Sequence, residues 1–292
     1  MAERADGRKG AGKKAAAKKR VPKPAAKKAA AKKANGNGNG NGQPVAAEAP
    51  NQGMPIFYSQ PEVLDSERHE GLELKPITSY EFTRNVNAIP VTAAEFPAVA
   101  RDYPIVFTTG DNPGAIAIVG LRRDENLMLE KKGQWLTGTY IPAYVRRYPF
   151  IFLRSSEGDQ YALCIDRASK QVAKGKKAPL FEGKELGDVT KNALEFCKAF
   201  QQQHMATEKV VKVLMEHDLL TENQGRFNLP DGRSVAITDF MTIDEKKFNE
   251  LSDDAFLAIR KSGALPPIYC QLISMGSWQR LVERFAILFP KA

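Results

Sequence analysis

Residues 135–152 constrain the fold of this chain most strongly, because aromatic side chains are dense there and two prolines divide the stretch. Pro142 can begin a short helical turn, since the missing N–H of a proline would be unpaired in the first turn of a helix. Pro149 ends that turn, because the residue before a proline is pushed away from helical backbone angles. The apolar run at residues 150–153 then predicts a buried strand. The stretch indicates how the fold is organised and identifies no reaction.

The first 50 residues cannot contribute to such a core, because they combine lysine–alanine blocks with an asparagine–glycine repeat. They contain no aromatic residue, and Val21 and Val45 are their only larger aliphatic side chains. A segment of this composition buries too little apolar surface to fold. We therefore predict a disordered tail at residues 1–53 and one folded domain at residues 54–292.

The net charge of +9 belongs to this tail. Residues 1–50 hold 13 of the chain's 43 basic residues and 3 of its 34 acidic residues, which leaves 30 basic and 31 acidic residues in the remainder. The remainder therefore has no overall positive field to attract nucleic acid. The lysine–alanine blocks resemble the tails of histone H1-like proteins. Two functions suit them, a solubilising spacer or weak nucleic-acid binding without sequence preference through counterion release, and the spacer is favoured.

The three cysteines indicate a reducing compartment. Cys164, Cys197 and Cys270 are odd in number and widely spaced, which favours buried thiols over a disulfide framework. The sequence contains no run of about 18 apolar residues, so no membrane span is predicted. The basic N-terminus lacks the apolar segment of a secretory signal. We expect a soluble, cytoplasmic protein.

Hydrophobic alternation and turn residues predict a sheet-rich N-terminal half. Strands are expected at residues 72–75, 105–108, 115–119, 127–129, 150–153 and 161–165. A short helix is expected at residues 93–100, with Thr92 as its N-cap and Glu95 in its first turn. Residues 170–184 are expected to form a polar loop.

The C-terminal half is predicted to be mainly helical. Two helices are expected around residues 189–200 and 210–217, followed by a small hairpin at residues 226–237. Ser252 is a predicted N-cap, and Gly263 supplies a stop for the helix between them. A last helical region begins near residue 266, with a break at residues 276–277. The fold class is therefore α+β, with an antiparallel N-terminal half and a helical C-terminal half.

Catalytic and metal-binding motifs are absent from the sequence. The spacings typical of zinc sites, phosphate-binding glycine loops and serine-nucleophile elbows do not occur. Cys197 and His204 are seven residues apart, too far for direct contact along a straight helix, so a buried thiol and an end-of-helix histidine are favoured. The run from Lys174 to Lys177 could contact phosphate, but a solvated loop is favoured. We expect no cofactor, no metal site and no identifiable catalytic residue.

A double arginine between two tyrosines is the most distinctive chemical feature. Arg146 and Arg147, flanked by Tyr144 and Tyr148, could hold a carboxylate or phosphate. An arginine in this setting can also stack on a tyrosine and pair with an acid at the edge of the core. Spacing alone does not separate a ligand site from a structural role.

The block at residues 140–150, together with residues 103–107, 118–121 and 243–248, resembles the SapC family of bacterial proteins, named after surface-layer gene clusters. The resemblance covers residues 54–288 or so and leaves out the tail. It implies a role in surface-layer biogenesis or export, and it supplies no catalytic residues. Some members are labelled peptide transporter permeases, which the absence of a long apolar run argues against.

These observations lead to two expectations for function. The first is a soluble, non-catalytic accessory protein for surface-layer or cell-envelope protein biogenesis, with an envelope or secreted protein as partner. The second is an enzyme or small-ligand-binding protein whose anion site is formed by Tyr144, Arg146, Arg147 and Tyr148. A cleft beside an arginine that has no internal carboxylate would favour the second.

Overall fold

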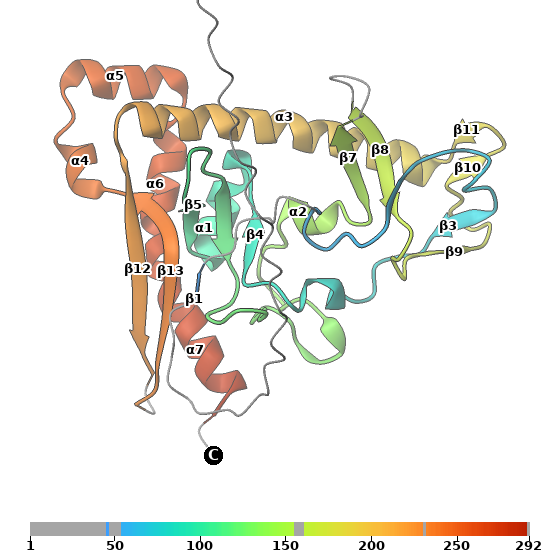
Figure 1. The fold of residues 1–292 in the computed structure, drawn as a ribbon, viewed down its shortest axis with the longest axis horizontal. Helices are drawn as coiled ribbons and strands as arrows, with labels where there is room; N and C mark the ends of the chain where they lie inside the picture. Colours follow the sequence, from blue (N-terminus) through green and yellow to red (C-terminus); the bar gives the residue numbers. More distant parts are fainter. Residues whose placement is uncertain (1–44, 47–53, 155–160, 230–231, 291–292) are drawn as a thin grey trace, which may run out of the picture. The chain divides into compact units, whose positions relative to one another are not determined.

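A computed structural model describes residues 54–154, 161–229 and 232–290, and the main chain of Val45 and Ala46 (Figure 1). Residues 41–292 belong to one compact unit. Within the predicted tail, β1 (Val45–Ala46) pairs in parallel with β13 (Ser234–Ile243). The other tail residues, on which the nucleic-acid alternative depends, lie outside the described residues, as do residues 155–159, whose serine and glycine residues predict a turn.

Apart from the parallel pairing of β1, the main sheet is antiparallel. β5 (Ile105–Thr108) pairs with β6 (Ala115–Ile118), and β4 (Ala88–Pro90) pairs with the other edge of β6. β13 continues the sheet beyond β5, and β12 (Leu220–Asn228) pairs with β13 in a long hairpin. Both β5 and β6 are buried at every position, because their apolar runs face covered sides of the sheet.

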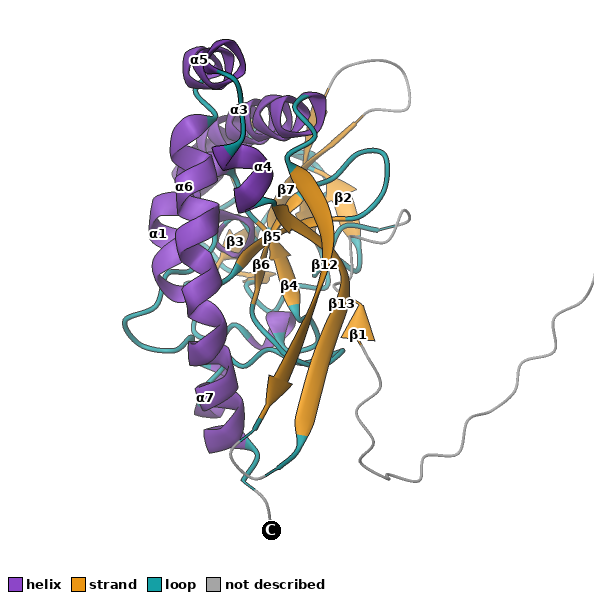
Figure 2. Cartoon of the chain, turned by 90° about the vertical axis from the view of Figure 1, so that its left-hand side faces the viewer, coloured by secondary structure: helices purple, strands orange, loops and turns teal. Residues whose placement is uncertain are grey.

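Three helices lie on one side of this sheet, as Figure 2 shows: α1 (Phe96–Asp102), α6 (Leu265–Ser274) and α7 (Trp278–Leu288). Two buried polar side chains attach α6 to β5. Gln271 donates through Nε2 to the Ile105 carbonyl over 3.1 Å, and Ser274 Oγ accepts from the Ile105 N–H over 2.9 Å. The mixed α+β fold class is confirmed.

Helix ends follow the predicted capping chemistry. α1 is preceded by a 3-10 turn at Ala93–Glu95 in which Thr92 and Glu95 form a capping box. Ser252 caps α5 (Asp253–Ser262) by accepting from the Ala255 N–H, and Gly263 ends it with a left-handed φ of 80°. The last helical region is interrupted by a 3-10 turn at Met275–Ser277, where the sequence predicts a break. The short helix α4 (Glu245–Asn249) precedes α5.

A second group of strands forms a smaller antiparallel sheet in the order β2 (Pro61–Val63), β8 (Tyr161–Asp166), β7 (Phe150–Arg154). Asp166 ends β8 and is fully buried. Its carboxylate accepts from the main-chain N–H groups of Ser59 and Gln60. The carboxylate therefore holds the segment that enters the fold against the end of β8.

The sequence prediction of two helices after residue 188 is wrong. One helix of 29 residues, α3 (Asp188–Glu216), runs from the β10–β11 region to the start of β12 (Figure 1). The stretch between the two predicted helices is attached through Thr207, whose hydroxyl donates to the Gln203 carbonyl over 2.7 Å and accepts from the Ala93 N–H over 2.8 Å. In this part of α3, a polar tertiary contact thus attaches the helix to the fold in place of apolar side chains.

Two further local predictions differ from the structure. Residues 127–129 form no strand and make only a single bridge between Leu129 and Trp135. The expected polar loop at residues 170–184 contains β9 (Val172–Lys174), which pairs with β3 (Leu72–Leu74). The same loop leads into a small hairpin of β10 (Phe181–Glu182) and β11 (Glu185–Leu186). These pairings depend on partners distant in sequence, which local patterning does not reveal.

Candidate functional site

The short helix α2 (Ala143–Arg146) carries the predicted arginine pair, and a buried carboxylate fixes where it begins. Pro142 lies at the N-cap, so the helix begins at Ala143, one residue after the predicted start. Glu95 Oε1 accepts from the Ala143 N–H over 2.6 Å and from the Tyr140 hydroxyl over 2.9 Å. Its Oε2 accepts from Thr92 through N and Oγ1. One carboxylate therefore connects the beginning of α1 to the beginning of α2.

Arg147 lies directly after α2 and is held by aromatic rings. Its guanidinium carbon is 4.0 Å from the ring centre of Tyr144 and 4.5 Å from that of Phe200. Its Nε is buried and has no hydrogen-bond partner among the described residues, and no described carboxylate forms an ion pair with it. Burial raises the pKa of Tyr144, and the Arg147 charge opposes that rise. The cation therefore interacts with ring faces and with the hydroxyls of Tyr58 and Tyr144.

Arg146 is exposed, whereas Arg147 is half-buried. Its Nε donates to the Ile141 carbonyl over 3.0 Å, and Nη2 donates to the Tyr140 hydroxyl over 3.0 Å. The guanidinium lies 5.4 Å from the ring centre of Phe196 on α3. Within the described chain Arg146 also has no ion-pair partner. Its orientation is therefore set by neutral oxygens.

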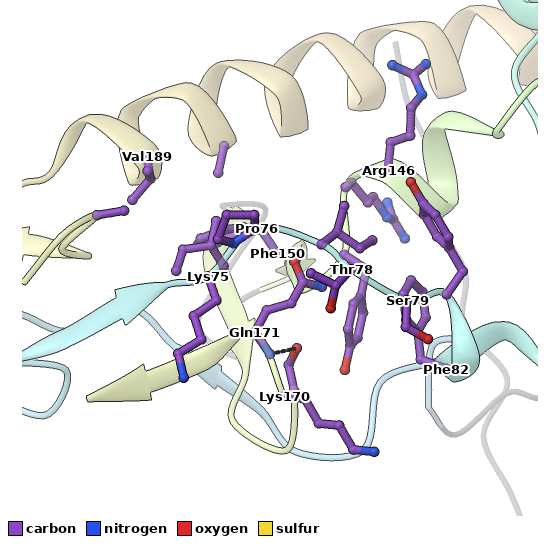
Figure 3. Close-up of a pocket in the computed structure, with 18 of the residues that line it drawn as sticks. Lys75, Pro76, Thr78, Ser79, Phe82, Arg146, Phe150, Lys170, Gln171 and Val189 are labelled. Atoms are coloured by element: carbon purple, nitrogen blue, oxygen red, sulfur yellow. Dashed lines mark hydrogen bonds between the residues drawn. The ribbon is translucent and has the colours of Figure 1, made fainter. Parts of the chain in front are cut away.

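Both arginines line a cleft of about 1440 Å³ (Figure 3). One wall is the segment of residues 73–82, and the opposite wall is one face of α3, with Val189, Asn192, Ala193 and Phe196 at helical spacing. Residues 168–171 and Phe150 complete it. Together with Phe57 and Ser59, parts of the chain that are far apart in sequence therefore form the cleft.

The charges that line the cleft are mainly positive. Five basic residues line it: Lys75, Arg146, Arg147, Lys170 and Lys177. Its two acidic residues, Glu73 and Glu81, have partners of their own. Glu73 Oε2 accepts from the main-chain N–H of Lys177 over 2.8 Å, and the Arg84 guanidinium holds the pKa of Glu81 below its usual value. The cleft is therefore complementary to an anion.

Three of the four predicted site residues line the cleft, and one does not. Arg146, Arg147 and Tyr148 line it, whereas Tyr144 is buried next to Arg147 and outside the lining. The Tyr148 ring stacks on Phe82 with 4.1 Å between ring centres, and its hydroxyl donates to Asp166 over 3.2 Å. Burial raises the pKa of Tyr148 to about 12. Tyr148 is thus a wall with a protonated hydroxyl, and Tyr144 supports Arg147.

Sequence reasoning missed most of the remaining lining residues. Lys177 belongs to the basic run for which phosphate contact was the less favoured interpretation, and it is the one lysine of that run that lines the cleft. No sequence pattern indicated Lys75 and Lys170 as site residues, because the pairing of β3 with β9 is what brings them close together. No periodic pattern links such distant positions.

The described lining contains no cysteine and no histidine. Cys197 lies on α3 beneath the cleft residues, and burial raises the pKa of its thiol to about 11 against the opposing Arg147 charge. His69 is fully buried, and its Nδ1 contacts the Asp65 main chain. Among residues placed in the structure, no three or more His, Cys, Asp or Glu side chains lie close enough to hold a metal ion. The cleft therefore offers cations, hydroxyls, amides and ring faces.

Comparison with known proteins gives one match. A family model described as SapC matches residues 64–281. No curated protein and no solved structure matches the chain. Among the helices that the structure describes, none is long and apolar enough to cross a membrane.

Proposed function

The chain belongs to the SapC family, and from this premise we propose that it is a binding protein whose cleft holds the anionic group of a ligand against Arg146 and Arg147. The observation that carries the proposal is Arg147, a half-buried cation that lines a cleft and has no carboxylate partner among the described residues.

The energetics of Arg147 favour an external anion. A buried donor without a partner costs about 1–3 kcal/mol, and contact with aromatic faces returns about 0.5–2 kcal/mol. A carboxylate or phosphate would accept charge-assisted hydrogen bonds from a guanidinium. Glu73 and Glu81 do not serve this role, because they bind Lys177 and Arg84. The ligand's anion would thus pair with a guanidinium that no described carboxylate neutralises.

The wider role that we propose is that of a cytoplasmic accessory protein for surface-layer or cell-envelope proteins, which acts by binding. Family membership supports it, and so does the absence of thiol and imidazole groups from the described cleft lining. An enzyme that acts on an anionic substrate would use the same cleft. Turnover of a bound anion by the full-length protein would favour that second candidate.

Binding of small anions to the full-length protein tests the site. Benzoate, phenyl phosphate and inorganic phosphate would be titrated by calorimetry against the wild type, Arg146→Gln and Arg147→Lys. We expect each variant to weaken binding at least about 10-fold, since a hydrogen bond to a charged group contributes about 1.5–3 kcal/mol. Arg147→Lys keeps the charge and removes the planar fork, which limits the risk of unfolding.

Arg260→Gln is the matched control, because Arg260 is an exposed arginine on α5, away from the cleft lining. Its affinity for each anion should equal that of the wild type. Absence of saturable binding by the wild type, or equal affinity in the wild type and both cleft variants, would overturn the proposal.

The accessory role has its own test. The full-length protein would be purified from its native host, and the retained proteins would be identified by mass spectrometry against an Arg146→Gln background. Enrichment of envelope or secreted proteins with the wild type alone would support the role. Retention of no such protein above background would remove its support.

A further inference from the structure

We propose that the ligand of this cleft is the C-terminal end of an extended peptide, whose terminal carboxylate binds Arg146 and Arg147 while its main chain pairs with Ile77 and Ser79. The inference rests on the proposed function and goes beyond it in naming the ligand class. It comes from the hydrogen bonding of residues 75–80, which the anion site does not use.

Residues 75–80 continue β3 without a turn or a bend. The segment is anchored at both ends through main-chain hydrogen bonds. The Lys75 N–H donates to the Gln171 carbonyl over 2.8 Å, and the Tyr80 N–H donates to the Gly133 carbonyl over 2.7 Å. Between these two anchors, the segment pairs with neither β9 nor any other described strand.

The middle of the segment leaves one edge open. Gln134 occupies the other edge, donating through Nε2 to the Thr78 carbonyl over 2.6 Å. Within the described chain, neither the N–H nor the carbonyl of Ile77 has a main-chain or side-chain partner, and the Ser79 N–H has none. In an extended chain, successive residues direct these groups to opposite edges. Ile77 therefore directs its groups away from Gln134.

That open edge borders the cleft. Ile77, Thr78 and Ser79 line the cleft, whereas Gln134 does not, and Ile77 is 36% exposed. An unpaired strand edge is a template on which an extended peptide can add as a further strand. Lys75 lies on the same edge as Ile77, and because its N–H is bound to the Gln171 carbonyl it ends the available edge on one side.

The positions of the cations set the direction of the peptide. Figure 3 shows Lys75 and Pro76 toward Val189 at one end of the cleft, and Ser79 toward Arg146 at the other. A peptide whose carboxylate binds at the arginines therefore runs parallel to residues 75–79. At about 3.3 Å per residue this edge accommodates about five residues.

The volume of the cleft and the side chains that line it also suit a peptide. The cleft volume of about 1440 Å³ exceeds the range of about 300–1,000 Å³ typical of small-molecule sites. Leu74, Phe150 and Phe196 provide apolar surface for alternate side chains. A free phosphate or an aromatic acid would fill only the arginine end.

The test uses changes in the ligand, so that the full-length protein stays intact. The probe is an N-acetylated pentapeptide of alternating leucine and alanine with a free carboxylate. Its comparators are the C-terminal amide and two peptides N-methylated at adjacent central residues. Benzoate serves as the small anion, and affinities are measured by calorimetry.

We expect the free acid to bind at least 10-fold more tightly than the amide. One N-methylated peptide should bind at least 5-fold more weakly than the other, because only alternate N–H groups face the protein. Arg146→Gln should lower the affinity of the acid and leave that of the amide unchanged, while Arg260→Gln should change neither.

Equal binding of acid and amide would overturn the inference, and so would equal binding of the two N-methylated peptides and their parent. Binding of benzoate without binding of any peptide would overturn it and leave the anion site standing. Failure of every anion to bind would overturn both.

Discussion

Replacing Glu95 by glutamine tests how the fold positions the arginine pair. Glu95 is 6% exposed, and the two oxygens of its carboxylate accept from four donors on Thr92, Tyr140 and Ala143. Glutamine keeps one acceptor oxygen and places an NH₂ group before the other donors. The capping box tolerates glutamine, so we expect the oxygen to stay with Thr92 and the NH₂ to face the Ala143 N–H.

The magnitude follows from those contacts. The Tyr140 hydroxyl can rotate to accept from the new NH₂, whereas the Ala143 N–H would be buried without an acceptor. An orphaned buried N–H costs about 1–3 kcal/mol, and the hydrogen bonds that remain lose their charge. We expect a loss of about 2–3 kcal/mol in unfolding free energy, or about 5–10 °C in Tm for a domain of this size.

Urea unfolding followed by circular dichroism measures the free energy, and amide hydrogen exchange measures protection at Ala143 and Thr92. Glu185→Gln is the control, because Glu185 is exposed on β11 and its side chain forms no hydrogen bond or ion pair with the described residues. Exchange at Ala143 should accelerate more than exchange at Thr92. A loss below about 0.5 kcal/mol, which is typical of neutral surface changes, would refute the reasoning, as would unchanged protection at Ala143.

Three further predictions concern other parts of the fold. Gly187→Ala places a Cβ 2.0 Å from the Pro179 carbonyl oxygen and should lower the free energy of unfolding by about 1–3 kcal/mol. In the control Gly276→Ala the added Cβ meets no atom within 4 Å. Similar Tm values for the two variants would contradict this prediction. Burial raises the pKa of Cys197 from 9.0 to about 11. As the pH rises, the thiol therefore ionises in the unfolded chain before it ionises in the folded chain. The contribution of the buried neutral thiol to stability is complete below pH 9 and is lost between pH 9 and 11. By pH 10 the loss is about 1.4 kcal/mol, and urea titrations at pH 8 and 10 should show it in the wild type and not in Cys197→Ala. Tyr148→Phe removes one hydrogen bond to Asp166 and should lower stability by about 1 kcal/mol; an unchanged urea midpoint would show that the bond contributes nothing.

The helix ends and tight turns could be predicted from sequence because each depends on a few neighbouring residues. Thr92 with Glu95, and Ser252 with Gly263, hold their own termini. The strands β5 and β6 followed from two apolar runs around one glycine-rich turn. These signals are local, so they hold in whatever fold surrounds them.

The tertiary structure decided the rest. α3 is continuous because Thr207 contacts Ala93, more than a hundred residues earlier. The double arginine marked the site, but spacing did not show whether an internal acid neutralises it. The cleft brings Lys75 and Lys177 to the same site as Arg147 only after β3 has paired with β9. Local patterns report what a residue does to its neighbours in sequence, and a binding site depends on which distant residues packing brings together.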